Sequence, residues 1–447
     1  MSRLFTFDFF KWFYPGMHIK RWLGLIIIGV AIMTFGLSYV VREAYLEGLR
    51  LPGFMYWVTL QFIPRYIRGV MFMSGAVSLI LFSIWKLNQS IISVLAPHRD
   101  SNESLVNTIY TQRFLRRGPK IVAIGGGTGL STLLRGLKEY STNLTAIVTV
   151  ADDGGSSGVL RRELGVLPPG DVRNCIAALA DAEPLVTKLF QYRFEDGEGL
   201  AGHSFGNLFI VAMSGVTGNM EDAIRQTSRV LAVRGQIIPS TMEDVTLCAR
   251  TDDARTIRGE SSIGPAVNGG GARIREVYLA PENPAAHPEA VRAILEADLI
   301  VLGPGSLYTS VLPNLLVQGV RRSLIAAPAP KVYVCNVATQ PGETDGFSVA
   351  DHVAAIEDHV GKGVINYVVA NDNVTDVIPK AEQSRPVRVD DPINNGIRLV
   401  ATDVISEENR YHHDSTKLSE VIMRIYDERD QLFVLPEAEE SLVTALD

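Results

Sequence analysis

Cysteine is scarce in this chain, which has three cysteines in 447 residues. Cys175, Cys248 and Cys335 are far apart in the sequence, and no C-x-x-C pair occurs. This spacing argues against a zinc site and against a disulfide framework. Reduced cysteines in a globular domain are the simplest interpretation.

Charged residues are also few, at 20% of the chain, and their signs are unevenly distributed. The net charge is −7, yet the first 117 residues are basic and the excess of acid follows them. Nucleic-acid binding requires a basic face. We therefore expect no nucleic-acid partner for the acidic C-terminal body, although a small anion could still be held by local backbone dipoles.

Several catalytic signatures are missing. No G-K-[ST] follows the glycine-rich segment at Gly125, which excludes a Walker A loop, and G-x-G-x-x-G is incomplete because position 130 is Leu. No Ser-His-Asp order, HExxH motif or cysteine nucleophile stands out. An NAD-dependent oxidoreductase is therefore only weakly supported.

Two uncharged apolar runs occur near the N-terminus. Residues 22–41 form a run of twenty and residues 69–85 a run of seventeen, close to the roughly 20 residues that span a bilayer. We expect a two-helix transmembrane hairpin over 1–90, followed by a basic juxtamembrane linker over 91–118 that could touch anionic lipid. The basic flanks place both termini and the main domain in the cytoplasm of a two-pass membrane protein. The alternative is that the shorter run is a buried or interfacial helix.

The body, 119–447, alternates strand and helix patterns. Residues 120–124 and 144–150 read as strands around a helix at 133–140, a βαβ unit that implies a mainly parallel sheet. The alternation recurs with a helix at 291–297, strands at 298–302, 332–336 and 365–370, and a helix at 352–360. Residues 235–279 are expected to form a β-rich insertion. The fold class is therefore α/β.

Glycines follow the first strand of the body. Gly125, Gly126, Gly127, Thr128 and Gly129, here named the first glycine turn, let the backbone approach a phosphate at the start of a helix. The alternative is a tight connection that holds no ligand. The turn therefore predicts a phosphate-bearing ligand.

Two acids follow the next strand. Asp152 and Asp153 occupy the position at which a dinucleotide-binding fold binds a ribose, or they could hold Mg²⁺; Ser156 and Ser157 come next. A solvated loop is the alternative. Because adjacent side chains need not point the same way, both carboxylates need not reach one ligand.

Further polar residues stand at predicted helix starts. Arg173 and Asn174 follow Asp171, which is equally well explained as a helix cap, and Arg173 could pair with a phosphate. His203 and Asn207 open an apolar helix and suit an anion or a sugar hydroxyl. A purely structural role remains an alternative for each.

A second glycine turn, Gly303–Ser306, follows the strand 298–302 and includes Gly305; Leu307 and Tyr308 come next. Residues 340–344 follow another strand. Ligands of open parallel sheets bind at the carboxyl ends of the strands. Both glycine turns are therefore expected to form one shared site.

These segments resemble the YvcK-type gluconeogenesis factor family, within the superfamily of 2-phospho-L-lactate transferase (CofD). The matching stretches include GGGTGLSTLLRGLK, TAIVTVADDGGSSG, LPPGDVRNC, HSFGNLF, ADLIVLGPGSLYTS and TQPGET. The resemblance runs from about residue 120 to about 370. Typical members lack the N-terminal hairpin, so its presence in this chain departs from the family pattern.

The resemblance implies a Rossmann-like three-layer α/β/α domain whose cleft is lined by both glycine turns, Tyr308, Asp152, Asp153, His203 and Asn207. It implies a UDP-sugar ligand, UDP-N-acetylglucosamine or UDP-glucose, and a regulatory role in gluconeogenic growth, cell shape and peptidoglycan synthesis through a cell-wall protein partner. The alternative is a Mg²⁺-dependent transferase of the 2-phospho-L-lactate type, with the metal on Asp152 or Asp153. The sequence leaves both catalysis and homo-oligomer formation open.

Overall fold

The chain divides into two compact units, Met1–Phe114 and Leu115–Asp447. The computed structural model describes residues 62–95, 114–181, 184–268, 271–373, 384–389, 393 and 396–432, with isolated positions between 28 and 60. Each unit is described by itself.

The first unit contains α4 (Arg65–Leu95), which includes the predicted second span, 69–85. Most of the predicted first span, 22–41, and of the linker, 91–118, lies outside the described residues. Among the residues that are described, no helix is long and apolar enough to cross a membrane. The predicted transmembrane hairpin and two-pass membrane localisation are therefore contradicted. The uncharged run is shorter than the roughly 20 residues that a span needs, and the helix continues beyond it through Lys86.

The second unit is built on a seven-stranded sheet in the order β10-β9-β8-β7-β1-β2-β3. Every neighbouring pair is parallel. The strands are β1 (Ile121–Gly125), β2 (Leu144–Val148), β3 (Gln236–Pro239), β7 (Leu299–Leu302), β8 (Lys331–Val334), β9 (Tyr367–Asn371) and β10 (Arg398–Thr402). The parallel sheet expected from the alternating strand and helix patterns is confirmed.

Helices cover both faces of this sheet. One face packs against α6 (Gly127–Leu137), α8 (Gly170–Leu179), α9 (Pro184–Gln191), α10 (Phe205–Thr217), α11 (Met220–Val230) and α17 (Ser415–Leu432). The other packs against α12 (Glu260–Asn268), α13 (Pro288–Leu295), α14 (Leu312–Leu316), α15 (Gln318–Ala326) and α16 (Val349–Val360). Alternate residues of a strand point to opposite faces, so Ile121 and Ala123 serve the first core and Val122 and Ile124 the second. The three-layer α/β/α architecture is confirmed.

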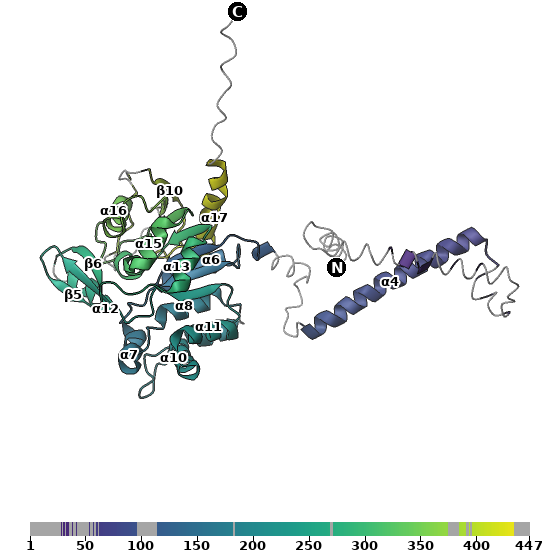
Figure 1. Ribbon diagram of the computed structural model, residues 1–447, viewed down its shortest axis with the longest axis horizontal. Coiled ribbons are helices and arrows are strands. Elements are labelled where there is room, and N and C mark those ends of the chain that lie inside the picture. Colours follow the sequence, from purple (N-terminus) through teal and green to yellow (C-terminus); the bar gives the residue numbers. More distant parts are fainter. Residues whose placement is uncertain are drawn as a thin grey trace, which may run out of the picture. The chain divides into compact units, whose positions relative to one another are not determined.

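A second, antiparallel sheet has the order β5-β4-β6 and lies at one side of the body (Figure 1). Its strands are β4 (Thr246–Thr251), β5 (Thr256–Arg258) and β6 (Ile274–Ala280). Leu247 and Val277 are buried in the core on the α13–α16 side. This confirms the predicted β-rich insertion at 235–279, except that β3 within it belongs to the main sheet.

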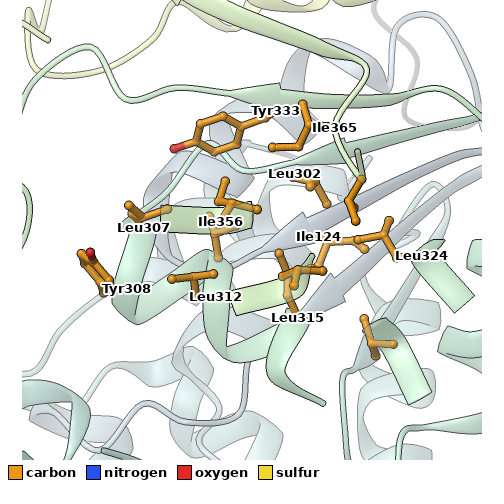
Figure 2. Close-up of a cluster of buried hydrophobic side chains, with 14 of the residues drawn as sticks. Ile124, Leu302, Leu307, Tyr308, Leu312, Leu315, Leu324, Tyr333, Ile356 and Ile365 are labelled. Carbon is orange, nitrogen blue, oxygen red and sulfur yellow. The ribbon is translucent and has the colours of Figure 1, made fainter. Parts of the chain in front are cut away.

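The core beneath the second glycine turn is shown in Figure 2. Ile124 and Leu302, from the neighbouring strands β1 and β7, pack among side chains of the helices on that face. Leu307 and Tyr308 are 0% and 3% exposed in the same cluster. Burying side chains of this size stabilises a fold by about 1.5–3 kcal/mol each. The two residues that follow the second glycine turn, Leu307 and Tyr308, are therefore held in the core.

Candidate functional site

The two glycine turns touch each other. β1 and β7 are neighbours, with Ile124 opposite Leu302, so the turns leave the sheet side by side at its carboxyl edge. A Cβ on Gly129 would lie 2.6 Å from the carbonyl oxygen of Pro304, and one on Gly305 would lie 3.2 Å from that of Gly126. Backbone meets backbone here because neither residue has a side chain, and the expected adjacency of the turns is present.

A cavity of about 480 Å³ opens at this junction. Comparable clefts occur at the opposite end of β1 and β2 and along the edge strand β3, but they lack the glycine turns. The lining residues are Gly126–Gly129, Thr132, Glu260, Pro304–Ser306, Thr309, Ser310, Asn336–Gln340, Glu343, Ser384 and Tyr411–His413. The first and second glycine turns, predicted from sequence, therefore share one cavity.

Helix α6 presents its N-terminus to this cavity. Its N-cap, Gly126, is extended and supplies no side-chain cap, and Gly127 adopts a left-handed φ of 67°. The carboxylate of Asp171 fills part of the gap: it accepts a hydrogen bond from the Gly127 N–H, and its Oδ2 would lie 2.5 Å from a Cβ on Gly126. Burial, then the charge of Asp152, raises the pKa of Asp171 to about 7.

The second glycine turn is also engaged by an acid. Ser306 Oγ donates to Glu343, and Thr309 Oγ1 donates to Ser306 Oγ at 2.7 Å. Burial raises the pKa of Glu343, while the hydrogen bonds from Ser306 and Thr309 oppose the increase. The Gly305 N–H donates to Asn336 Oδ1 at 3.3 Å. The polar groups of this turn are therefore largely satisfied within the protein.

Glu260, the first residue of α12, adds a second acid, beside Glu343, to the cavity lining. Burial, followed by the charges of Asp152 and Glu343, raises its pKa to about 8. Sequence reasoning missed Glu260 because no motif marks it. Glu343 lies in the stretch 340–344, which was predicted to reach this edge.

The paired acids point to different places. Asp152 Oδ1 accepts the N–H of Gly154 at 2.9 Å, and Asp153 Oδ1 accepts that of Ser261 at 2.9 Å. Neither residue lines the cavity. Burial raises the pKa of Asp152. In the described part of the chain, no group of three His, Cys, Asp or Glu residues is placed to hold a metal ion.

A separate polar cluster forms around the start of α7 (Gly155–Leu164). Asn207 Nδ2 donates to Ser156 Oγ at 3.0 Å, and Ser156 Oγ lies 2.9 Å from His203 Nδ1. Because Ser156 accepts from the amide, its own hydroxyl is free to donate to the imidazole. We name Ser156, His203 and Asn207 the Ser–His–Asn cluster.

The other predicted residues connect this cluster to the first glycine turn. Ser157 hydrogen-bonds to Asp152, and Arg173 donates to Asn174 Oδ1 at 2.8 Å. The charges of Asp152 and Asp171 both act on Arg173, whose pKa is lowered chiefly by burial. The predicted residues thus fall into two groups: the glycine turns in the cavity, and the Ser–His–Asn cluster with its neighbours outside the cavity lining.

Leu307 and Tyr308 were also predicted to contact the ligand. Their side chains point into the core shown in Figure 2 and do not line the cavity. The Tyr308 backbone N–H instead hydrogen-bonds to Glu343. They support the second glycine turn from below.

The C-terminal segment supplies a wall that sequence reasoning missed. β10 runs parallel to β9, so the chain beyond it emerges at the same edge as the glycine turns. Tyr411, His412 and His413 then line the cavity. His413 Nε2 donates to the Cys335 carbonyl at 3.1 Å, and burial lowers the pKa of His413 to about 4. The His-His pair before α17 was the only available signal.

Residues 121–406 match the family model described as 2-phospho-L-lactate transferase CofD. The gluconeogenesis factor of Bacillus subtilis is 47% identical over 317 residues, which cover 69% of this chain and 99% of that protein. A Nostoc sp. protein, provisionally named a gluconeogenesis factor, is 48% identical over 432 residues, 94% of this chain and 93% of its own length. Coverage of 94% must extend well before residue 115, so the Nostoc relative shares the N-terminal region, whereas the Bacillus subtilis relative matches over nearly its whole length yet covers only 69% of this chain.

A crystal structure of a Bacillus halodurans protein has a TM-score of 0.65 and 44% identity, and covers 69% of this chain and all of that one. At 44% identity, the similarity between the two proteins extends beyond a shared fold. With the matched glycine turns and parallel sheet, these comparisons show that the chain belongs to the CofD family and, within it, to the YvcK-type gluconeogenesis factors.

Proposed function

We propose that this protein binds a UDP-sugar, UDP-N-acetylglucosamine or UDP-glucose, in the cavity between the glycine turns. The binding serves regulation: it links central carbon metabolism to cell-wall synthesis and cell shape through a protein partner. The observation that carries the proposal is the N-terminus of α6, whose N-cap residue Gly126 supplies no side-chain hydrogen bond and which faces a cavity of about 480 Å³. Ligand pockets typically measure about 300–1,000 Å³.

The chemistry of the two turns supports a ligand with a diphosphate and a polyhydroxyl part. The N–H groups of Thr128 and Gly129 at the start of α6 suit the diphosphate, whereas the N–H of Gly127 already donates to Asp171. Glu343, Glu260 and Asn336 supply oxygen acceptors at which sugar hydroxyls would donate. The name of the Bacillus subtilis relative, gluconeogenesis factor, supports the metabolic side of the proposal.

Isothermal titration calorimetry on residues 115–447 tests this function. This part folds by itself, since relatives in Bacillus consist almost entirely of its equivalent. We expect binding of a UDP-sugar and much weaker binding of GDP and NAD. Absence of binding by both UDP-N-acetylglucosamine and UDP-glucose would refute the proposal.

The second candidate is a Mg²⁺-dependent transferase acting on a nucleotide diphosphate-linked substrate, favoured by the match to the 2-phospho-L-lactate transferase model. Asp152 or Asp153 would hold the metal, whose charge would stabilise the developing phosphate charge. Turnover that requires Mg²⁺ and disappears in Asp153→Asn would support it. Binding without turnover in the presence of Mg²⁺ would favour the regulatory function.

A further inference from the structure

A buried amide side chain lies beside the two glycine turns. Asn314 is 0% exposed and is the only polar residue of α14, whose sequence is LPNLL. Its neighbours Leu312 and Leu315 belong to the apolar cluster shown in Figure 2. Asn314 itself does not line the cavity. A polar group in these surroundings is costly unless its hydrogen bonds are made, so the bonds of Asn314 deserve to be followed.

The Asn314 side chain connects the first glycine turn to the segment that follows the second. Its Nδ2 donates to the carbonyl oxygen of Gly125 at 3.0 Å and to that of Ser310 at 2.8 Å. Because carbonyl oxygens can only accept, the nitrogen of the amide must be the atom that faces them. Ser310 belongs to the π-helix Leu307–Val311 and lines the cavity. One side chain therefore bonds to the backbone of both segments.

These bonds fix the direction of the peptide group that enters the first glycine turn. The Gly125 carbonyl also accepts the N–H of Thr149, the residue after β2, at 3.1 Å. Because a trans peptide is planar, the Gly126 N–H points opposite to the Gly125 carbonyl. Gly126 is the N-cap of α6 and lines the cavity. Asn314 therefore helps to set the orientation in which α6 begins.

Stability alone does not account for an amide at this position. The Oδ1 atom of Asn314 is buried and has no hydrogen-bond partner among the described residues, and an unpaired buried acceptor is destabilising. A leucine has nearly the same shape and carries no such atom, and the Gly125 carbonyl would keep its bond from Thr149. Short π-helical segments like the one before α14 occur frequently at functional sites. The geometry of the turns explains the amide better than folding does.

We propose that Asn314 is a positioning residue of the ligand site. Its amide holds the first glycine turn against the π-helix, and this keeps the N–H groups of Thr128 and Gly129 directed at the ligand. Asn314 acts through the turns and does not touch the ligand. The inference rests on the proposed function for the identity of that ligand, but the order of the unliganded turn can be measured without it.

Asn314→Leu in residues 115–447 removes both hydrogen bonds with little change of shape. We expect the affinity for UDP-N-acetylglucosamine and UDP-glucose, measured by calorimetry, to fall about tenfold or more, while the melting temperature changes by less than about 4 °C. Leu324→Ala is the matched control, because Leu324 is 0% exposed in the same core but lies in α15. Its cavity should lower the melting temperature more and leave the affinity within about twofold. Wild-type affinity in Asn314→Leu would overturn the inference.

Amide hydrogen exchange separates this inference from the identity of the ligand. The N–H groups of Gly127 and Thr149 donate to Asp171 and to the Gly125 carbonyl. In the unliganded protein their exchange, followed by NMR, should become about tenfold faster or more in Asn314→Leu and stay near the wild-type rate in Leu324→Ala. Faster exchange in a protein that binds no UDP-sugar would refute the proposed function and leave the role of Asn314 standing. Unchanged exchange in folded Asn314→Leu would overturn that role, whatever the ligand.

Discussion

The two glycine turns look alike in sequence but use their polar groups differently. The first leads into the eleven-residue helix α6, whose N-cap has no side-chain bond. The second leads into a five-residue π-helix, Leu307–Val311, beside which Ser306 and Glu343 already hydrogen-bond. Similar strand-turn patterns therefore lead to different results. The first turn starts a helix whose N-cap residue makes no side-chain hydrogen bond, and the second turn already bonds to Glu343.

This difference assigns the two ends of the proposed ligand. A helix of eleven residues offers several N–H groups and a dipole to an anion, and at the first turn the acid in the way, Asp171, has a pKa of about 7. At the second turn, Glu343 is fixed by hydroxyl donors. The diphosphate should therefore lie at the first turn and hydroxyl groups at the second.

The largest expected effect comes from separating the turns. In Gly129→Val the new side chain would start 2.6 Å from the Pro304 carbonyl oxygen, and overpacking of this kind costs about 1–3 kcal/mol. We expect UDP-sugar affinity, measured by calorimetry, to fall by about 100-fold or more. Gly215→Ala in α10 is the control, because nothing lies within 4 Å of its Cβ position. Unchanged affinity in Gly129→Val would show that the ligand does not need the contact between the turns.

The next effect distinguishes the two acids. Asp171→Asn removes a negative charge beside the proposed phosphate position, so we expect the affinity for UDP-sugar at pH 8 to rise about tenfold, or roughly 1.4 kcal/mol. Glu343→Gln should change it less. At pH 5.5, where Asp171 is largely protonated given its pKa of about 7, the Asn variant should lose its advantage. A fall in affinity would mean that Asp171 contacts the ligand directly or through a cation.

The acids also predict a pH dependence of the unliganded protein. The pKa values of Asp171 and Glu260 are raised to about 7 and about 8, so between pH 5 and 8 the folded state binds more protons than the unfolded state. The free energy of unfolding should therefore fall as the pH rises through this range. We expect Asp171→Asn with Glu260→Gln to recover about 1 kcal/mol at pH 8, measured by urea unfolding. An equal gain at pH 5 would show a cause other than ionisation.

The smallest effect should come from the second turn. Ser306→Ala removes the donor to Glu343, and a single neutral–charged hydrogen bond of this kind is worth about 1.5–3 kcal/mol to stability at most. Affinity for UDP-sugar should change by less than about threefold, since the phosphate lies at the other turn. Titration calorimetry of Ser306→Ala beside Thr132→Ala, which lies in α6 just after the first glycine turn, tests the contrast. A greater loss in Ser306→Ala would reverse the assignment of the ligand ends.

Local patterns predicted much of the fold. The apolar strands that became β1, β2, β7, β8 and β9 were visible because they are buried on both faces of a parallel sheet. The helix after the first turn begins at Gly127, earlier than the predicted 133, because tertiary contacts override the low helix propensity of glycine. β10 escaped detection because its residues are only partly buried.

Site residues were predictable where a turn motif marked them. The two glycine turns were found because strands that neighbour in a parallel sheet end at one edge. Glu260 and Tyr411 were missed because they reach the cavity from distant elements without a local signature. Leu307 and Tyr308 follow a turn motif, yet burial turns their side chains to the core.

A crystal structure of residues 115–447 with UDP-N-acetylglucosamine tests the account most directly. We predict the diphosphate oxygens within hydrogen-bond distance of the backbone N–H groups of Thr128 and Gly129, with the sugar hydroxyls toward Glu343. Phosphates bound at Ser306 and Thr309, or within the Ser–His–Asn cluster, would contradict the assignment of the first glycine turn as the anion site.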